Sequence, residues 1–302
     1  ALRVNLEAGP YLAEDALKLR LIDKVGQVKE VENAALAKAG KDAELVGFEK
    51  YMRASRDRIP KTGPAIAIVE GEGAIVTGHD GSTNPFSASS SMYSDDISEA
   101  LYDAIEDKDV KAIVFRVSSP GGSDTASEQI LAAVRAAKAA KKPVVVSMGT
   151  YAASGGYWVS SEASAIVAHP TTLTGSIGVF GGKFAVGEAL ARFGVDMRQI
   201  GVGGEYAGAF GTATPMTPAQ KAAFAGWMDR IYDNFVAHVA TGRNLPPERV
   251  REIAKGRVWT GAQAREIGLV DEVGGFYQAV DKAKALAGVK GDVHLKRMTT
   301  QT

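Results

Sequence analysis

Short runs rich in Val, Ile and Ala alternate with segments of helical length between residues 65 and 168, and this alternation constrains the fold more than any other feature. Runs of this kind are typical of strands that are buried on both faces. Strands that alternate with helices predict α/β units with a mostly parallel sheet. The expected strands are 65–69, 111–117, 143–147 and 165–168, and the expected helices between them are 97–107 and 127–140.

The composition excludes several classes of function. The chain has 35 basic and 35 acidic residues, so its net charge is zero and a strong field for nucleic acid is not expected. It has no cysteine, which excludes disulfides, thiolate catalysis and cysteine-ligated metals. The four histidines lie far apart in the sequence, so no metal site is expected.

An internal repeat is the second constraint. Residues 11–26 match residues 259–274 without gaps, at an offset of 248. Each copy is predicted to form a short helix, a turn containing Leu and Asp, a glycine and then an Ala-rich helix. Identical residues occupy five of the matched positions: Ala16/Ala264, Leu21/Leu269, Asp23/Asp271, Val25/Val273 and Gly26/Gly274.

The repeat also predicts how the chain is divided. The second copy closes a long α/β region, whereas the first copy stands near the start of the chain. We therefore expect a two-unit parent protein. The predicted divisions are a tail of the preceding unit (1–47), a connector (48–63), the main domain (64–288) and a C-terminal tail (289–302). Within the main domain, the Ser-rich stretch 79–96 is expected to be a mobile loop, and 220–241 a long packing helix.

Three turns of small residues each follow a predicted strand. They are Ser-Ser-Pro-Gly-Gly-Ser at 118–123, Gly-Thr-Tyr-Ala-Ala-Ser-Gly-Gly-Tyr-Trp at 149–158 and Thr-Leu-Thr-Gly-Ser-Ile-Gly at 172–178. Each of them alone is most simply an ordinary turn. Because the carboxyl ends of parallel strands meet at one edge of a sheet, the three turns are expected to line one cleft.

The residue types in these turns suit acyl transfer. A Pro-Gly-Gly turn before a helix can direct backbone N–H groups at a developing negative charge. Ser154 lies in a relaxed form of the Gly-x-Ser-x-Gly elbow, with Ala152 at the first glycine position. A serine at a helix start is also a common N-cap, so the residues alone leave both interpretations open.

In this order and spacing, the three motifs resemble the signal peptide peptidase A family of serine proteases, over about residues 64–288. The resemblance is to the long, internally duplicated bacterial form. It implies a Clp protease/crotonase-like fold of repeated ββα units. It also implies that Ser154 is the nucleophile and that the N–H groups of Gly121 and Gly155 form the oxyanion hole.

The resemblance assigns three more residues and raises one question. It implies that Gly122 and Ser123 bind substrate and that Ser176 hydrogen-bonds a general-base lysine. The short form of the family carries this lysine in a Gly-x-Tyr-Lys pattern, but the corresponding stretch here ends in Ala207. Lys183 is interpreted as a loop lysine. In the long form the lysine comes from the first domain, so we expect this chain to lack its base.

Further expectations follow from the resemblance. They are a substrate of apolar signal-peptide remnants, a homo-oligomer, no cofactor, and attachment to the bacterial inner membrane with the catalytic part facing the periplasm. Three alternatives stay open. One is a Ser–His enzyme that uses His169. Another is a crotonase-type acyl-CoA enzyme that needs only backbone N–H groups, and the last is a catalytically inert scaffold half.

Overall fold

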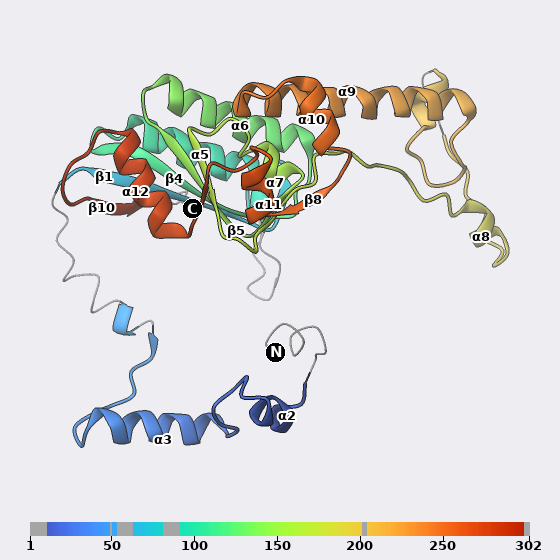
Figure 1. Cartoon of the computed structure of the whole chain (residues 1–302). Coiled ribbons are helices and arrows are strands. Elements are labelled where there is room, and N and C mark those ends of the chain that lie inside the picture. The colour runs from blue at the N-terminus through green and yellow to red at the C-terminus, as the bar shows by residue number, and fades with distance from the viewer. Residues whose placement is uncertain (1–10, 49, 53–62, 81–90, 201–203, 299–302) are drawn as a thin grey trace. The chain divides into compact units, whose positions relative to one another are not determined.

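The computed structural model describes residues 11–48, 50–52, 63–80, 91–200 and 204–298 (Figure 1). The chain divides into two compact units, Ala1–Lys61 and Thr62–Thr302. Each unit is described by itself below.

The second unit is built on a mostly parallel sheet. Its strand order is β10-β1-β4-β5-β6-β9, and every neighbouring pair along this path is parallel. The strands of the path are β1 (Ala65–Glu72), β4 (Val110–Ser119), β5 (Val144–Ala153), β6 (Ala165–Ala168), β9 (Glu272–Val273) and β10 (His294–Arg297). The four predicted strands are therefore confirmed. Residues 294–297, which the sequence assigned to a tail, instead form the edge strand β10.

Shorter strands extend this sheet and flank it. Strand β7 (Leu173–Gly175) pairs with the end of β5 in parallel and with β8 (Val258–Thr260) in antiparallel. Strands β2 (Ala74–Val76) and β3 (Ser91–Tyr93) form a separate parallel pair. The predicted strand at 143–147 runs on to Ala153, because its last three residues pair with β7.

Helices cover both faces of the sheet (Figure 1). One hydrophobic cluster packs β-strand residues such as Phe115 against one set of helices, and the other packs residues such as Val114 against a single helix. The first set comprises α5 (Ser94–Glu106), α6 (Asp124–Ala139), α7 (Gly155–Trp158), α9 (Pro218–Arg243), α10 (Pro247–Ile253) and α11 (Gly261–Glu266), and the single helix is α12 (Phe276–Leu286). The predicted α/β class with a mostly parallel sheet is confirmed by this arrangement.

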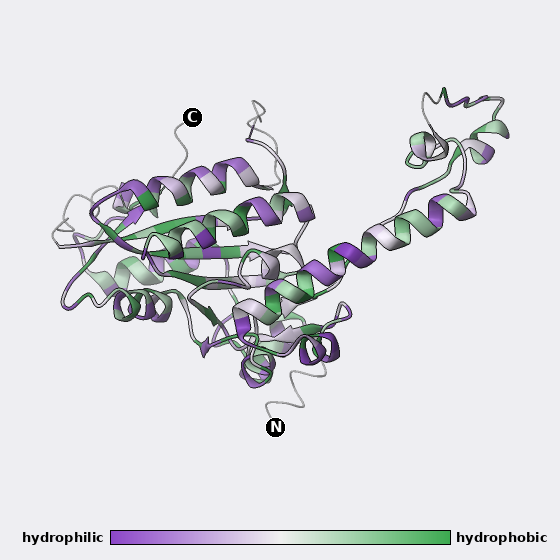
Figure 2. Cartoon of the chain, turned by 90° about the horizontal axis from the view of Figure 1, so that it is seen from above, coloured by the Kyte–Doolittle hydropathy of each residue, from purple (hydrophilic) through white to green (hydrophobic). Residues whose placement is uncertain are grey.

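The long helix α9 changes surroundings along its length. It begins with a capping box formed by Thr217 and Gln220. Its C-terminal half buries Ile231 and Phe235 in the core. Its N-terminal half extends beyond the sheet, towards α8 (Gly187–Ala191) and the 3-10 helix η1 (Glu205–Gly208) (Figure 2). There Trp227 stays 41% exposed, so the predicted packing helix meets the core only over part of its length.

The predicted loop at 79–96 is wrong in its last part. Residues 81–90 lie outside the described residues. Residues 91–93 form β3, and α5 begins at Ser94. The His79 ring is hydrogen-bonded to Asp96, with 2.8 Å between Nδ1 and Oδ1. Burial of Met92 and contacts of this kind order the segment, which its Ser-rich composition did not predict.

The first unit repeats a motif of the second. Its helices α2 (Ala13–Lys18) and α3 (Val28–Ala39) begin at the positions that match the starts of α11 and α12. The predicted helix–turn–helix is thus confirmed in both copies. No residue of α2 or α3 is buried, whereas α12 buries Ala279, Val280 and Ala283.

Candidate active site

Three strand ends bring the three small-residue turns together. Strand β4 ends at Ser119, β5 at Ala153 and β7 at Gly175. In the sheet register Ser119 is opposite Ala152, and Ala153 is opposite Gly175. The turns that follow all contribute to one cavity of about 830 Å³. The convergence predicted from the parallel sheet is therefore observed.

The Pro-Gly-Gly turn is held by main-chain contacts. Ile75 of β2 donates its N–H to the Gly121 carbonyl at 3.0 Å and accepts the Ser123 N–H at 2.9 Å. A Cβ on Gly122 would lie 2.1 Å from the Ile75 carbonyl oxygen, and one on Gly121 would lie 2.6 Å from the Gly155 nitrogen. Because Gly121 also has φ +103°, only glycine fits this approach of two backbones.

Ser154 sits on a strained turn between β5 and α7. Its φ is 52° and its ψ is −122°, a conformation that few residues other than glycine adopt. Its N–H donates to the Gly175 carbonyl at 2.9 Å, and its own carbonyl accepts the N–H groups of Tyr157 and Trp158. Its side chain makes no capping bond with α7. The main chain thus begins the helix, and the hydroxyl is left available at the cavity.

Tyr157 anchors the short helix that follows the serine. This side chain is fully buried, and its hydroxyl donates to the Leu269 carbonyl at 2.8 Å. Burial raises the pKa of the phenol, so the group remains a donor. The turn at Ser154 is therefore held both by strand β7 and by the core.

The backbone donors differ from the prediction at one position. No described residue accepts the N–H of Gly155, as an oxyanion hole requires. The Gly121 N–H donates instead to the Ser119 hydroxyl at 3.1 Å. The N–H of Gly122 has no acceptor among the described residues, so Gly122 is the free donor of this turn. The sequence could not show that a serine side chain occupies the first donor.

Ser123 has a structural task. Its hydroxyl caps α6 by accepting the Ala126 N–H, and its own N–H is bonded to Ile75. It does not contribute to the lining of the 830 Å³ cavity. Ser176 does line the cavity, with φ 49° and its N–H donated to the Arg257 carbonyl at 2.7 Å. Of the predicted substrate contacts, Gly122 therefore lines the cavity and Ser123 does not.

The rest of the cavity is lined by apolar and by charged residues. The apolar residues include Trp158, Met228, Ile231 and Phe235, three of which belong to α9. The charged residues are Asp124, Asp229 and Lys255. The sequence singled out none of these three. Lys255 follows α10, far along the chain from the motifs, and no local pattern marks it.

The other predicted base candidates lie elsewhere. Lys183 lies in a loop, as predicted, and donates to the Gly211 carbonyl at 2.8 Å. Ala207 lies in η1 and is exposed. His169 is bonded to Thr171 and lines a different cavity, which argues against a Ser–His pair. The Ser154 hydroxyl is hydrogen-bonded to no residue that the structure describes.

Within the described ranges, no three His, Asp or Glu side chains gather in an arrangement that could hold a metal ion. Among the described helices, none is both long and apolar enough to cross a bilayer.

The chain is similar in sequence to several known proteases. The chain is 39% identical over 284 residues to "Protease 4" of Salmonella typhi, covering 93% of this chain and 44% of that protein. It is 33% identical over 291 residues to the chloroplastic serine protease SPPA of Arabidopsis thaliana, covering 94% and 42%. It is 36% identical over 188 residues to a putative protease of Synechocystis, covering 62% and 67%. The chain thus spans less than half the length of the first two relatives.

A solved structure of a membrane-bound stomatin-specific protease aligns with 80% of this chain and 100% of that chain, at 13% identity and a TM-score of 0.47. The family model described as "Peptidase family S49" matches residues 136–290, which include Ser154 and Ser176. Together with the relatives, this match shows that the chain belongs to peptidase family S49.

Proposed function

We propose that this chain carries the nucleophile of a serine endopeptidase, Ser154. The observation that carries the proposal is the position of its hydroxyl: on a strained turn, at the start of α7, facing a cavity beside the free N–H of Gly155. The Ser154 oxygen would attack the peptide carbonyl and release the amine, which takes a proton from the base. Water would then hydrolyse the acyl-enzyme.

Backbone donors would stabilise the oxyanion of this reaction. Gly155 and the Gly121–Gly122 turn approach each other closely, and the N–H groups of Gly155 and Gly122 are both free among the described residues. Such preorganised donors are usually the largest single contribution to acyl transfer. We therefore assign the oxyanion hole to this pair of segments, with the Gly122 N–H in the role that the family resemblance implied for Gly121.

The base is proposed to be a lysine from the preceding polypeptide, as in a Ser–Lys dyad. A serine hydroxyl is a poor nucleophile without a base, and no described residue is hydrogen-bonded to Ser154 or Ser176 through the hydroxyl. Ser176 lines the cavity and would orient the incoming amine. Lys255 lines the same cavity and is the second candidate for the base.

Activity of the separate and combined parts tests this assignment. The chain alone is expected to leave an apolar fluorogenic peptide intact, and addition of the preceding polypeptide should start cleavage that Ser154→Ala abolishes. Lys255→Met is the matched variant and should leave the restored cleavage unchanged. Strong Ser154-dependent cleavage by the chain alone would refute the proposal that the base lies outside this chain. If Lys255→Met then abolished that cleavage, the base would be Lys255.

The organisation of the whole protein is proposed to be a tandem of two similar units. Residues 1–47 would close the preceding unit, 48–63 would connect, and 64–288 with β10 would form the nucleophile domain. The matched helix starts in α2/α11 and α3/α12 support this division. The unburied face of α3 supports a further sheet that covers it in the parent protein.

Substrate and assembly are proposed from the surfaces. The apolar wall of Trp158 and Phe235 would suit apolar peptides such as remnants of signal peptides. Phe180, Phe184 and Phe193 are 97%, 87% and 83% exposed, which supports a homo-oligomer packed through this segment. Attachment to the inner membrane, facing the periplasm, is proposed through polypeptide outside these residues. The relatives are named as proteases and give no support to the acyl-CoA alternative.

A further inference from the structure

Trp158 lines the proposed substrate cavity, as Ser154 does. It is the last residue of α7, and its N–H donates to the Ser154 carbonyl at 2.9 Å. Its side chain lines the cavity and is only 5% exposed. The indole packs on Phe235 of α9, with ring centroids 4.7 Å apart. A shift of this ring therefore changes the shape of the cavity that Ser154 also lines.

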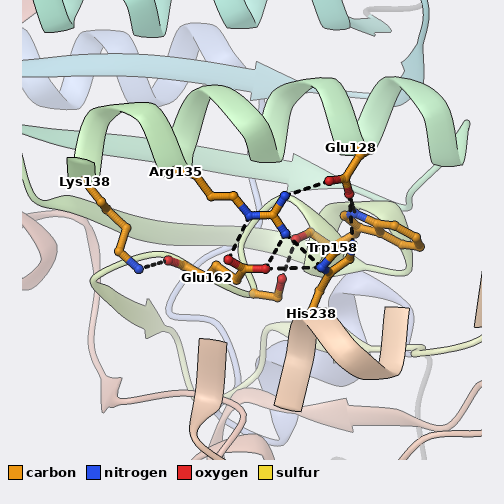
Figure 3. Close-up of polar contacts among 7 residues, drawn as sticks. Glu128, Arg135, Lys138, Trp158, Glu162 and His238 are labelled. Atoms are coloured by element: carbon orange, nitrogen blue, oxygen red, sulfur yellow. Dashed lines mark hydrogen bonds and ion pairs between the residues drawn. The ribbon is translucent and has the colours of Figure 1, made fainter. Parts of the chain in front are cut away.

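The orientation of the indole is fixed by one carboxylate. Its Nε1–H donates to Glu128 Oε2 on α6 at 2.9 Å (Figure 3). A buried indole N–H needs an acceptor, and an ionised acceptor makes a stronger hydrogen bond than a neutral one. Two sides of the ring are thus specified: the face by Phe235, and the N–H edge by Glu128.

Glu128 is itself held in place by Arg135 and His238. Its Oε1 accepts from Arg135 Nη1 at 2.7 Å, and its Oε2 lies 3.0 Å from His238 Nε2 (Figure 3). Burial by itself would raise the pKa of this carboxyl, but hydrogen bonds from His238, Trp158 and Arg135 outweigh it and lower the pKa to about 2. Glu128 therefore remains an anion and an acceptor throughout the physiological range.

His238 completes the polar cluster between two carboxylates. Its Nδ1 lies 2.8 Å from Arg135 Nη2 and 3.2 Å from Glu162 Oε1. Its Nε2 faces Glu128. Arg135 is bound on its other side by Glu162, at 2.5 Å between Nη2 and Oε1.

The Glu128–Trp158 bond joins the two segments that flank the cavity. Helix α6 begins directly after the Pro-Gly-Gly turn and its cap Ser123, and α7 begins directly after Ser154. Glu128 is on the second turn of α6, and Trp158 ends α7. This contact therefore links the helix behind one backbone donor to the helix behind the other.

We propose that Glu128 is a positioning residue of this site: through the Trp158 N–H it sets the width of the cavity beside Ser154, and with it the size of the substrate side chain accepted there. The inference rests on the proposed peptidase function. Glu128 touches no reacting atom and acts only through Trp158. Without its carboxylate the indole is free to turn, and discrimination between small and large apolar side chains is lost.

Peptide binding tests the proposal, because binding does not require the general base of the reaction. The probes are labelled apolar peptides with a reduced, uncleavable bond at the cleavage position, preceded by Ala, Leu or Phe. Their Kd values are measured by fluorescence anisotropy with the complete chain. Glu128→Ala is expected to change the ratio of the Kd values for the Ala and Phe peptides by about tenfold, which corresponds to loss of a charge-assisted hydrogen bond. Glu128→Gln, which keeps an acceptor oxygen, should restore part of the ratio.

Two further variants separate positioning from general stability. Glu162→Gln removes a charge from the same cluster without touching Trp158, so it should lower stability and leave the Kd ratio unchanged. Trp158→Phe keeps a ring but removes the N–H, and it should reproduce the Glu128→Ala ratio. In a variant that combines Glu128→Ala with Trp158→Phe, the two changes in the Kd ratio should not add.

The outcomes distinguish this proposal from the proposed function. An unchanged Kd ratio in Trp158→Phe, or an equal change in Glu162→Gln, would overturn the positioning role of Glu128. If Glu128→Ala fails to fold, Trp158→Phe and Glu128→Gln decide the matter alone. Failure of the unsubstituted chain to bind any of the three peptides would instead overturn the peptide-binding site on which the proposal stands.

Discussion

The two copies of the repeated segment have the same helices and opposite surroundings. In the second copy, Ala279 and Ala283 of α12 are fully buried against the sheet. At the matching positions of the first copy, Val31 is 66% exposed and Ala35 is exposed as well. The comparison teaches that the local sequence is enough to specify a helix–turn–helix, whereas burial is a property of the sheet that the segment meets.

The largest difference between the copies is expected for a charge placed on the inner face of the second helix. Ala283→Asp would bury an unpaired carboxylate and should lower the free energy of unfolding by more than about 4 kcal/mol. Ala35→Asp, its counterpart, should change it by less than about 0.5 kcal/mol. Urea unfolding followed by tryptophan fluorescence measures both. Equal losses would mean that α3 is covered within this chain.

A smaller difference is expected at the aspartate of the shared turn. Asp271 accepts the Ile166 N–H at 2.7 Å and the Arg243 guanidinium at 2.6 Å, and the Arg243 side chain is only 7% exposed. Asp271→Asn should cost about 2 kcal/mol, less than for a fully buried pair because the carboxylate is partly exposed. Asp23→Asn should leave the unfolding midpoint of this chain unchanged. Once the preceding polypeptide is added, Asp23→Asn should lower the unfolding midpoint. An unchanged midpoint would show that the proposed tandem arrangement is wrong.

The smallest effect is expected at the helix ends, and it should be the same in both copies. Gly40 follows α3 with φ +112° and Gly288 follows α12 with φ +66°, and an added Cβ would meet no atom within 4 Å at either. The strain of an alanine therefore comes from the backbone itself and should cost about 1 kcal/mol in both copies. Hydrogen exchange of the amides in 28–39 and 276–286 measures it. A cost confined to α12 would show that helix ends also depend on the sheet.

The sequence predicts most of the fold because its strongest signals are local. Runs such as Val144–Val146 predict buried strands, and the order of strands and helices then predicts where the three turns meet. The extension of β5 to Ala153 is missed, because Tyr151, Ala152 and Ala153 pair with β7, a contact that no local pattern shows. The same limitation applies to β10, which exists as the partner of β1.

The candidate site is predictable in its motifs and less so in its details. Ser154 and Gly155 stand out because the strained turn requires small residues around the hydroxyl. The choice between the donors of Gly121 and Gly122 depends on the Ser119 hydroxyl, which folding brings into reach. Lys255 reaches the cavity from a distant segment of the chain, and the hydrogen bond from Trp158 to Glu128 joins two helices. No spacing along the chain records contacts of this kind.

The hold of Ile75 on the Pro-Gly-Gly turn has a consequence for how the site can evolve. Both hydrogen bonds come from the main chain of Ile75, so any apolar residue that fits the same space keeps the Pro-Gly-Gly turn in place. Proline is the exception, since it has no N–H to donate. The side chain at position 75 can therefore vary among related proteins as long as its volume is similar, because the backbone alone holds the turn.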